Sequence, residues 1–186
     1  MCCHGGFSLD EKTRRSWYNP EAILEDLRSG MVFADIGCGE GFFSMLAAKK
    51  VGDKGKVYSV DVDASAIQKL KDKAEVEGLK NISAKVGMAE QTVFCDKCVD
   101  FVFYSMVLHD FNDSAVVLKN AKKMLKADGR LVDLDWKKQE MPFGPPFKIR
   151  FNEEHASNIV KKAGFQIDQV KAVGSYHYVI TAKPLI

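Results

Sequence analysis

Short apolar runs alternate with helix-like stretches along most of this chain, and this alternation constrains the fold more than any other feature. The runs are nearly continuous in apolar residues, as strands are when helices cover both faces of their sheet. The helix-like stretches supply the long crossovers that parallel strands need. We therefore predict an α/β, Rossmann-like, doubly wound sheet that is mostly parallel. The predicted strands are 32–36, 56–60, 82–86, 99–104 and 130–134, and the predicted helices between them are 41–49, 65–77 and 114–126.

The last part of the chain follows a different pattern. Asn152 is a good cap for a helix over 153–163, and two more apolar runs follow at 165–170 and 176–182. The link over 172–175 is too short for a crossover helix, so we expect these two strands to be antiparallel. The complete predicted sheet thus has seven strands, with an antiparallel pair at its carboxyl-terminal end and helices on both faces.

The 186 residues are enough for one domain with a single sizeable core, and a second domain is not expected. Residues 1–18 are polar and show no sustained period, so we predict a flexible segment that is a candidate lid. Asn19 and Pro20 have the residue types that begin a helix, and Gly30 is placed to end it. We expect one domain over 19–186.

Charge and hydropathy exclude several classes of protein. The 27 basic and 25 acidic residues leave a formal net charge of +2, so nothing supports a nucleic-acid partner. No apolar run reaches the roughly 20 residues that span a bilayer, and the sequence does not begin like a signal peptide. We therefore expect a cytoplasmic protein without a membrane partner; the oligomeric state is not indicated.

A glycine-rich turn directly after the first predicted strand is the most informative motif. Asp35 ends the strand, and Gly37, Gly39 and Gly41 follow before a helix begins. Glycines at this point let the chain turn tightly and let a ligand contact bare backbone at the edge of the sheet. A dinucleotide-binding fingerprint would place its third glycine at position 42, where this chain has Phe42. The spacing therefore disfavours a nicotinamide dinucleotide.

Three further strand ends are predicted to meet at the same crevice. Asp61 lies 20 residues after Gly41, at the tip of the second strand, where a carboxylate accepts both hydroxyls of a ribose. The third strand ends near Met88, and the fourth ends near Ser105 and leads to His109. The ligand crevice of an open α/β sheet lies at such carboxyl ends, so these residues are candidates for one binding site.

Together these motifs resemble the class I S-adenosylmethionine-dependent methyltransferases, and among them the type 11 or UbiE-like branch that acts on small molecules. The resemblance covers about residues 32–186 and includes the final antiparallel pair. It implies an enzyme that transfers a methyl group from S-adenosylmethionine to a small-molecule acceptor, with S-adenosylhomocysteine as the product and no metal. A non-catalytic S-adenosylmethionine-binding module is an alternative, because binding alone requires the same residues.

The resemblance also implies a set of cofactor contacts. The methionine moiety would lie over the glycine turn with Asp35 near its ammonium group, and Asp61 would hold the ribose. Val62 would pack on the adenine, whose edge Met88 would approach. Many relatives carry an aspartate where Met88 stands, so the adenine amino group is left to backbone, to Glu90 or to no partner. The implied cofactor-binding residues are Asp35, Gly37, Cys38, Gly39, Gly41, Asp61, Val62, Met88, Ala89, Ser105 and Met106.

Methyl transfer from a sulfonium group needs alignment of two reactants more than a dedicated acid or base. If a base acts, His109 is the candidate, because it follows the fourth strand and titrates near neutral pH. The alternative is a histidine that caps a helix or bonds locally. For Arg150 and Lys137 a solvated charged face is the favoured interpretation. The candidates for acceptor contact are Tyr18, Trp136, Arg150 and His177, with Trp17, Lys137 and Tyr176 beside them. For most of them, packing in the core or rim is the favoured interpretation.

The five cysteines are Cys2, Cys3, Cys38, Cys95 and Cys98. An odd number in a reducing compartment argues against a disulfide framework. Cys95 and Cys98 have the spacing of half a zinc site, but a second such pair is absent, so we interpret them as an incidental pair of thiols and predict no metal. Soft thiolates also make an arsenite or metalloid methyltransferase an alternative. Cys38 is expected to be a small apolar filler in the glycine turn.

Overall fold

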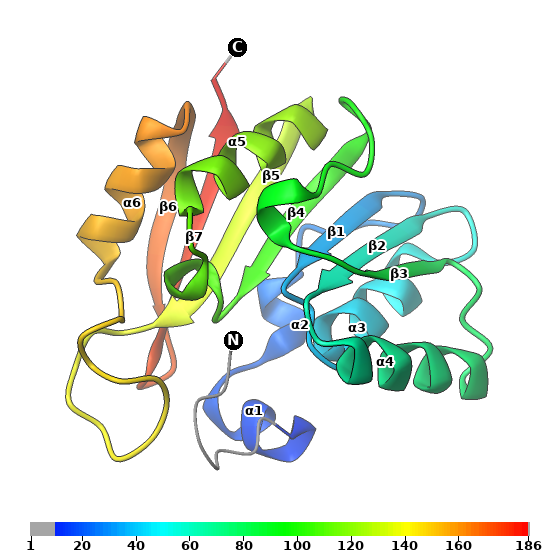
Figure 1. The fold of residues 1–186 in the computed structure, drawn as a ribbon, viewed down its shortest axis with the longest axis horizontal. Helices are drawn as coiled ribbons and strands as arrows, with labels where there is room; N and C mark the ends of the chain where they lie inside the picture. Colours follow the sequence, from blue (N-terminus) through cyan, green and yellow to red (C-terminus); the bar gives the residue numbers. More distant parts are fainter. Residues whose placement is uncertain (1–9, 186) are drawn as a thin grey trace.

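The computed structural model describes residues 10–185, which form one seven-stranded sheet with helices on both faces (Figure 1). The strand order is β3-β2-β1-β4-β5-β7-β6, with β7 antiparallel to both of its neighbours. The predicted Rossmann-like, mostly parallel sheet with its antiparallel pair is therefore confirmed. The strands are β1 Val32–Ile36, β2 Lys56–Asp61, β3 Ile82–Val86, β4 Val99–Ser105, β5 Leu125–Trp136, β6 Phe165–Val173 and β7 His177–Pro184.

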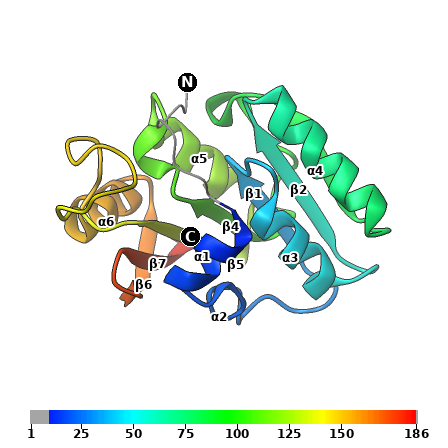
Figure 2. The same cartoon turned by 90° about the horizontal axis from the view of Figure 1, so that it is seen from below.

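Helices cover the sheet in two layers (Figure 2). Because both faces are covered, side chains along a central strand alternate between two apolar cores: in β1, Phe33 packs with α3, whereas Ala34 packs on the side of α5. Within residues 10–185, none of the helices is long and apolar enough to cross a membrane. The helices are α1 Glu11–Trp17, α2 Pro20–Ile23, α3 Phe42–Val51, α4 Ala64–Val76, α5 Ser114–Met124 and α6 Glu153–Lys162, with short 3-10 turns η1 Ala89–Gln91 and η2 Leu108–Asp110.

The helix predicted over 19–30 is much shorter in the structure. Asn19 caps it as predicted, but the helix ends at Ile23. Leu24 is nonetheless fully buried, and its carbonyl accepts a hydrogen bond of 2.7 Å from Nζ of Lys50 on α3. The spacing of the apolar residues therefore predicted correctly which residues are buried, but the predicted helix was too long. After Ile23 the chain is held by contacts with the core and not by further helical turns.

Strand β5 is longer than the predicted strand over 130–134, and the preceding helix is shorter. β5 begins at Leu125, directly after α5, and continues to Trp136. Leu125 is fully buried and pairs with Val99 of β4 ahead of an irregularity in the register. Pairing with β4 thus overrides the helical period that extended the predicted helix to position 126.

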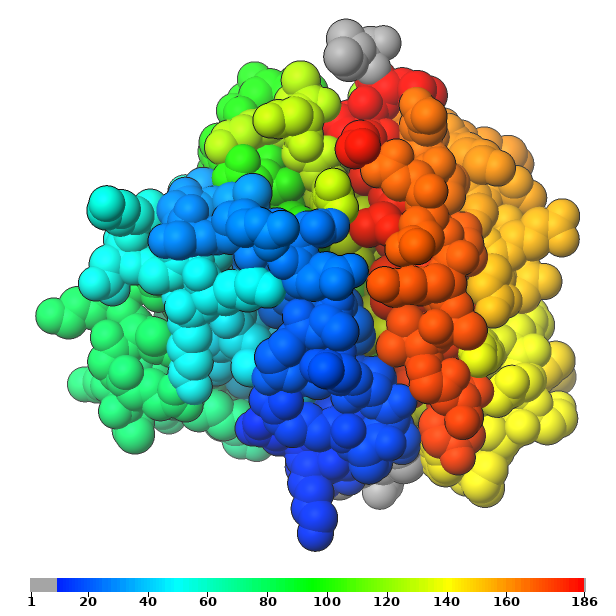
Figure 3. All heavy atoms as spheres, turned by 180° about the vertical axis from the view of Figure 1, so that it is seen from behind, coloured from blue at the N-terminus to red at the C-terminus, as the bar shows by residue number. Residues whose placement is uncertain are grey.

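Residues 10–18 were predicted to lack regular structure, yet they contain α1. Asp10 caps this helix by accepting a hydrogen bond of 2.9 Å from the Thr13 N–H. At its other end Trp17 packs against Trp136 and His177, with ring centroids 5.3 and 5.4 Å apart. The α1–α2 segment lies alongside β6 and β7 (Figure 3). A helix this short shows no recognisable spacing of apolar residues in the sequence, and its position is set by these contacts. Residues 1–9 of the predicted flexible segment lie outside the described residues.

Cys95 and Cys98 form a disulfide in the loop before β4, where free thiols were expected. Their Cα atoms are 6.0 Å apart, which suits such a bond. Lys97 between them has a positive φ of 49°, which turns the loop back on itself and brings the two side chains together. Cys2 and Cys3 lie outside the described part of the chain. Within residues 10–185 no group of three or more His, Cys, Asp or Glu side chains is arranged to hold a metal ion.

Candidate functional site

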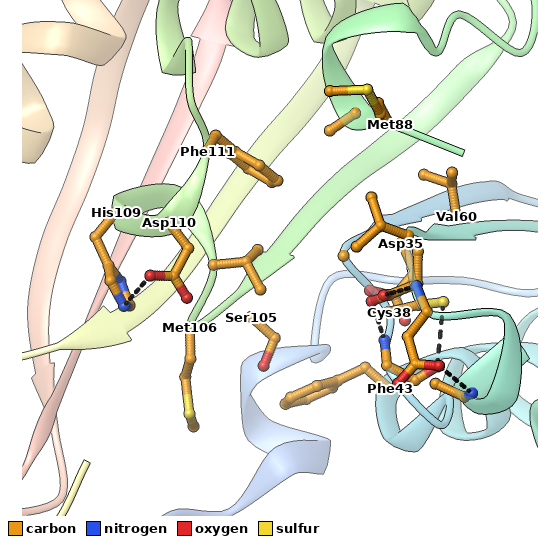
Figure 4. A pocket seen from close by; sticks show the side chains of 18 of the residues that line it. Asp35, Cys38, Phe43, Val60, Met88, Ser105, Met106, His109, Asp110 and Phe111 are labelled. Atoms are coloured by element: carbon orange, nitrogen blue, oxygen red, sulfur yellow. Dashed lines mark hydrogen bonds and ion pairs between the residues drawn. The ribbon is translucent and has the colours of Figure 1, made fainter. Parts of the chain in front are cut away.

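A cavity of about 510 Å³ opens at the carboxyl ends of β1, β2, β4 and β5, the edge where the sequence predicted a ligand crevice (Figure 4). Its volume is typical of small-molecule sites. The picture shows Asp35 and Cys38 on one side of this space and Ser105 and His109 on the other. The cavity wall brings together Asp35, Gly37, Cys38, Gly39, Asp61, Val62, Met88, Ala89, Ser105 and Met106, which are all of the predicted cofactor-binding residues except Gly41.

Hydrogen bonds to β2 hold the glycine turn in place. The Cys38 N–H donates to the carbonyl of Val60 at 3.1 Å. Gly39 has a φ of +53° and open space where a Cβ would stand, so a ligand can approach its backbone. Gly41 does not line the cavity: a Cβ there would lie 2.2 Å from the side chain of Leu70 on α4. A glycine at position 41 is therefore needed for packing of the turn and not for ligand contact.

Asp61 stands at the tip of β2, where it fastens the glycine turn and still faces the cavity. One carboxylate oxygen accepts the Gly39 N–H at 2.8 Å, and the other accepts the Asp63 N–H at 2.9 Å. A carboxylate oxygen accepts more than one hydrogen bond, so both oxygens retain capacity. The backbone contacts fix the direction of the carboxylate, and the remaining lone pairs are suited to a pair of neighbouring hydroxyls on a ligand.

Asp35 is a buried carboxylate with one oxygen uncompensated. Oδ2 accepts a hydrogen bond of 2.6 Å from the Ser44 hydroxyl, while Oδ1 has no hydrogen-bond partner among residues 10–185. Burial raises the pKa of Asp35 to about 6, although Ser44 and the charge of Arg14 lower it. A buried acceptor without a partner is costly, so this oxygen on the cavity wall favours a ligand that donates to it, above all a cationic one.

Arg14 is a site residue that the sequence reasoning missed. It reaches the cavity wall from α1, where its Nη1 donates to the Ser105 hydroxyl at 3.3 Å. Its guanidinium group also lies over the ring of Phe42, 5.1 Å from the centroid. Neither the composition of residues 10–18 nor the spacing of their apolar residues distinguishes Arg14 from its polar neighbours, so no signal in the sequence could have identified it as a site residue.

The far end of the cavity is apolar and more open. Val62 and Met88 are exposed by 50% and 39%, enough for both to cover a flat ligand at the rim, whereas Ala89 is buried. Glu90 also lines this end, and its Oε1 accepts the Asp113 N–H at 3.4 Å. Glu90 therefore lies at this end of the cavity, where the sequence analysis named it as a possible partner for the adenine amino group in place of the aspartate that many relatives carry at the position of Met88.

His109 lines the opposite end of the cavity and belongs to a buried network. Its Nδ1 lies 2.8 and 2.9 Å from the two carboxylate oxygens of Asp135 on β5. Its Nε2 lies 3.5 Å from Oδ1 of Asp110. Burial lowers the pKa of His109, but the hydrogen bond and charge of Asp135, together with Asp110, outweigh burial and raise it overall. His109 is therefore held beside the cavity by two carboxylates, and its side chain is almost fully buried.

Of the four predicted acceptor residues, only Trp136 lines the cavity; Tyr18, Arg150 and His177 do not. Arg150 is buried, so the favoured interpretation as a solvated charge is wrong. Its guanidinium group donates to the carbonyls of three residues in the loop that follows β5, at 2.7 to 2.9 Å, and so shapes that loop. Burial lowers the pKa of Arg150. The three carbonyls belong to Gln139, Phe143 and Pro145.

His177 is fully buried behind the cavity wall, among the rings of Trp17, Tyr18 and Trp136. Neither ring nitrogen has a hydrogen-bond partner within the described residues. Burial, together with the charges of nearby cations, lowers the pKa of His177 to about 3. Lys137, another predicted neighbour, donates instead to the carbonyl of Gly174 at 3.3 Å. His177 therefore holds α1 against the sheet as an uncharged aromatic ring.

The cysteines contribute no thiolate to the described cavity wall. Cys38 is the cysteine that lines it, and burial raises the pKa of its thiol, as do the carboxylates of Asp35 and Asp61. Cys95 and Cys98 do not line the cavity. The arrangement therefore gives no support, within residues 10–185, to the metalloid alternative.

Some other wall residues come from segments that sequence reasoning had not assigned to the site. Phe43 belongs to the first turn of α3, and Phe111 and Asn112 follow η2. The latter two could have been found by extending the fourth strand tip, because they lie two and three residues after His109. Gly144 and Pro145 come from the loop after β5, whose path over the cavity depends on the Arg150 contacts and leaves no periodic signal.

The fold and sequence are similar to those of known methyltransferases. A family model described as a methyltransferase domain matches residues 27–174. The solved structure of an S-adenosylmethionine-dependent methyltransferase from Aquifex aeolicus has a TM-score of 0.88 and 32% identity, with 94% of each chain covered. A putative type 11 methyltransferase from Sulfolobus solfataricus has a TM-score of 0.76 and 25% identity, with 91% of this chain and 94% of that chain covered.

Curated relatives are longer than this chain. The ubiquinone/menaquinone biosynthesis C-methyltransferase UbiE of Haemophilus ducreyi is 30% identical over 165 residues, which are 88% of this chain and 61% of that protein. A demethylmenaquinone methyltransferase of Bacillus cereus is 26% identical over 121 residues, which are 65% of this chain and 51% of that protein. The chain therefore spans between half and two thirds of the length of these relatives.

Proposed function

The chain belongs to the class I S-adenosylmethionine-dependent methyltransferases, in their type 11 branch, and from this we propose that it methylates a small-molecule acceptor. The observation that carries the proposal is the cavity itself, in which two fixed aspartates and an arginine stand around the glycine turn. The charges and hydrogen-bonding groups of this wall support S-adenosylmethionine as the cofactor.

The ribose end of the cofactor fits Asp61 and the rim. Asp61 is held by two backbone N–H groups and keeps lone pairs for the two ribose hydroxyls. Val62 and Met88 offer apolar surface for the adenine beside it. Asp61 would therefore set the position of the sugar, and the two apolar side chains would cover the base.

The amino-acid end of the cofactor carries an ammonium and a carboxylate, and the wall offers a complement to each. The uncompensated Oδ1 of Asp35 would accept from the ammonium group, which would also favour the ionised form of that buried carboxyl. Arg14 lines the same part of the cavity and would pair with the carboxylate. Because Arg14 comes from α1, we also propose that the segment around α1 acts as a lid.

The cofactor supplies an activated methyl group, and the chain aligns an acceptor with it and excludes water. Alignment of two reactants contributes on the order of 7–11 kcal/mol to catalysis of a displacement. Phe43, Phe111 and Trp136 give the acceptor side largely apolar walls that keep water out. His109 stands in the same space and is the residue that would accept a proton if the acceptor loses one.

A quinol ring is the acceptor class that the relatives' names favour, since those proteins are named for ubiquinone and menaquinone biosynthesis. The aromatic walls formed by Phe111 and Trp136 support a flat acceptor of this kind. A soluble quinol such as 1,4-naphthoquinol, offered with labelled S-adenosylmethionine, tests this finer part of the proposal; label in the naphthoquinol product supports it, and label only in thiols or arsenite contradicts it.

Calorimetric titration of S-adenosylmethionine and S-adenosylhomocysteine, with NAD as the control ligand, tests the proposed site. We expect both sulfur compounds to bind the wild type and to bind Asp61→Ala about 100-fold more weakly, because two charge-assisted hydrogen bonds are lost. Asp53→Ala removes an exposed carboxylate and should leave binding unchanged. Binding of NAD alone, or equal affinity of the two variants, would contradict the proposal.

A further inference from the structure

The hairpin turn between β6 and β7 receives the end of α1. It consists of residues 174–176, and Val173 pairs with His177 at its base. Gly174 has a φ of +56°, and a Cβ on it would lie 2.0 Å from the backbone carbonyl oxygen of Trp17. This distance is far shorter than a van der Waals contact, and a backbone atom cannot rotate away as a flexible side chain can. α1 therefore reaches its observed position only because residue 174 has no side chain.

Further contacts hold the two sides of this junction. On the side of α1, the Trp17 ring stacks on Phe143 with 5.6 Å between the ring centroids. On the side of the hairpin, Nζ of Lys137 donates to the Gly174 carbonyl at 3.3 Å, and the Lys137 N–H donates to the Tyr176 carbonyl at 2.8 Å. Because the turn is also continuous with two paired strands, we expect a side chain at position 174 to displace the short helix α1 and not the hairpin.

The junction is connected to the cavity through Arg14. Arg14 lies three residues before Trp17, so the two are neighbours on the surface of α1. Arg14 lines the cavity, whereas Gly174 and Trp17 do not. We infer that Gly174 is a positioning residue for the cofactor: by letting the Trp17 carbonyl lie against the hairpin, it places the Arg14 guanidinium group beside the carboxylate of S-adenosylmethionine. The inference rests on the proposed function, because it needs that carboxylate in the cavity.

The inference predicts a loss of affinity that is confined to one end of the ligand. The Arg14 guanidinium group lies 3.3 Å from the Ser105 hydroxyl and over the ring of Phe42, so a shift of α1 would withdraw it from the amino-acid end of the cavity. Asp61 and Val62, which would hold the ribose and the adenine, belong to β2 and the residue directly after it. Ligands with an amino-acid arm should therefore depend on residue 174, and ligands without this arm should not.

Calorimetric titration of Gly174→Ala with two ligands tests this difference. S-adenosylhomocysteine carries the amino-acid arm, whereas 5′-methylthioadenosine keeps the adenine, the ribose and the sulfur and lacks the arm. We expect Gly174→Ala to bind S-adenosylhomocysteine about tenfold more weakly than the wild type, because a charge-assisted hydrogen bond is lost, and to bind 5′-methylthioadenosine equally well. Gly78→Ala is the matched control and should bind both ligands as the wild type does, since Gly78 has a φ of +68° and nothing within 4 Å of its Cβ position.

Two more measurements separate positioning from general damage to the fold. Arg14→Ala should weaken S-adenosylhomocysteine binding by a similar factor, and the double variant with Gly174→Ala should bind it no more weakly than Arg14→Ala alone. The chain has two tryptophans, Trp17 and Trp136, and both lie near the junction. Their near-ultraviolet circular dichroism should therefore change in Gly174→Ala and stay the same in Gly78→Ala.

Trp17→Ala removes the ring that holds α1 at the same junction, so it keeps the inference testable if Gly174→Ala does not fold. We expect it to show the same selective loss of S-adenosylhomocysteine binding. Equal weakening of the two ligands, unchanged affinity of Gly174→Ala for S-adenosylhomocysteine, or additive losses in the double variant would overturn the inference. A wild type that binds neither ligand would instead overturn the proposed function.

Discussion

Replacing His177 with phenylalanine should remove an acid-side loss of stability. His177 is fully buried among aromatic rings, and its pKa falls from 6.5 to about 3. The native state therefore keeps the ring neutral, while the unfolded chain takes up a proton as the pH falls below about 6.5. Stability from this depressed pKa is fully present above 6.5 and is lost between 6.5 and about 3.

The expected size follows from the distance between the two pKa values. At pH 5 the ring in the unfolded chain is about 1.5 units below its pKa, so the wild type should lose about 2 kcal/mol relative to His177→Phe between pH 7.5 and 5. Asp35 acts with the opposite sign, because its raised pKa of about 6 makes the native state take up a proton first. The two contributions partly cancel in the wild type, so the difference between variant and wild type is the informative quantity.

Urea unfolding followed by far-ultraviolet circular dichroism at pH 7.5 and 5.0 measures this difference. His155→Phe is the matched control, because His155 is exposed on α6 and its replacement should follow the wild type at both pH values. At pH 7.5 we expect His177→Phe to be within about 1 kcal/mol of the wild type, since one buried ring replaces another. A variant-to-wild-type difference that changes by less than about 0.5 kcal/mol with pH would refute the buried, neutral state of His177.

Two further predictions concern a second buried acid and the lid. Burial and the neighbouring Asp135 raise the pKa of Asp133 well above 3.8, so the wild type should lose stability relative to Asp133→Asn as the pH rises from about 4 through the native pKa of Asp133. Urea unfolding at pH 5 and 8 measures this, and an unchanged difference contradicts a protonated Asp133. Trypsin cleavage after Arg14 or Arg15 on α1 should slow when S-adenosylhomocysteine is bound; equal cleavage rates with and without it would contradict the lid.

The sequence predicted the central sheet well because its signals there are local. The run that became β3 lies between Asn81 and Gly87, so both of its ends could be read directly, and Gly37 likewise marks the end of β1. The early end of α2 and the early start of β5 depend instead on contacts with distant segments, such as the pairing of Leu125 with Val99. Tertiary contacts of this kind override a local period and cannot be read from it.

The site residues likewise fall into some that could be predicted from local sequence and some that depend on tertiary contacts. Asp35, Asp61 and His109 were predicted to share a crevice because parallel strands bring their carboxyl ends to one edge, and the structure places all three on the cavity wall. Arg14 could not be predicted, because a seven-residue helix docked by aromatic contacts brings it there. His177 was predicted to contact an acceptor, but α1 covers it, and no pattern in the sequence reveals that cover.

The loop that carries Gly144 and Pro145 to the cavity is fastened by a side chain from its own end, since Arg150 bonds three of its carbonyls. The tips of β1 and β2, which carry the two aspartates, take no part in these three hydrogen bonds. The two ends of the cavity are therefore held by different sets of hydrogen bonds. We expect substitutions in the stretch between β5 and Arg150 to change the molecules that the cavity accepts, while the aspartates and the glycine turn stay as they are.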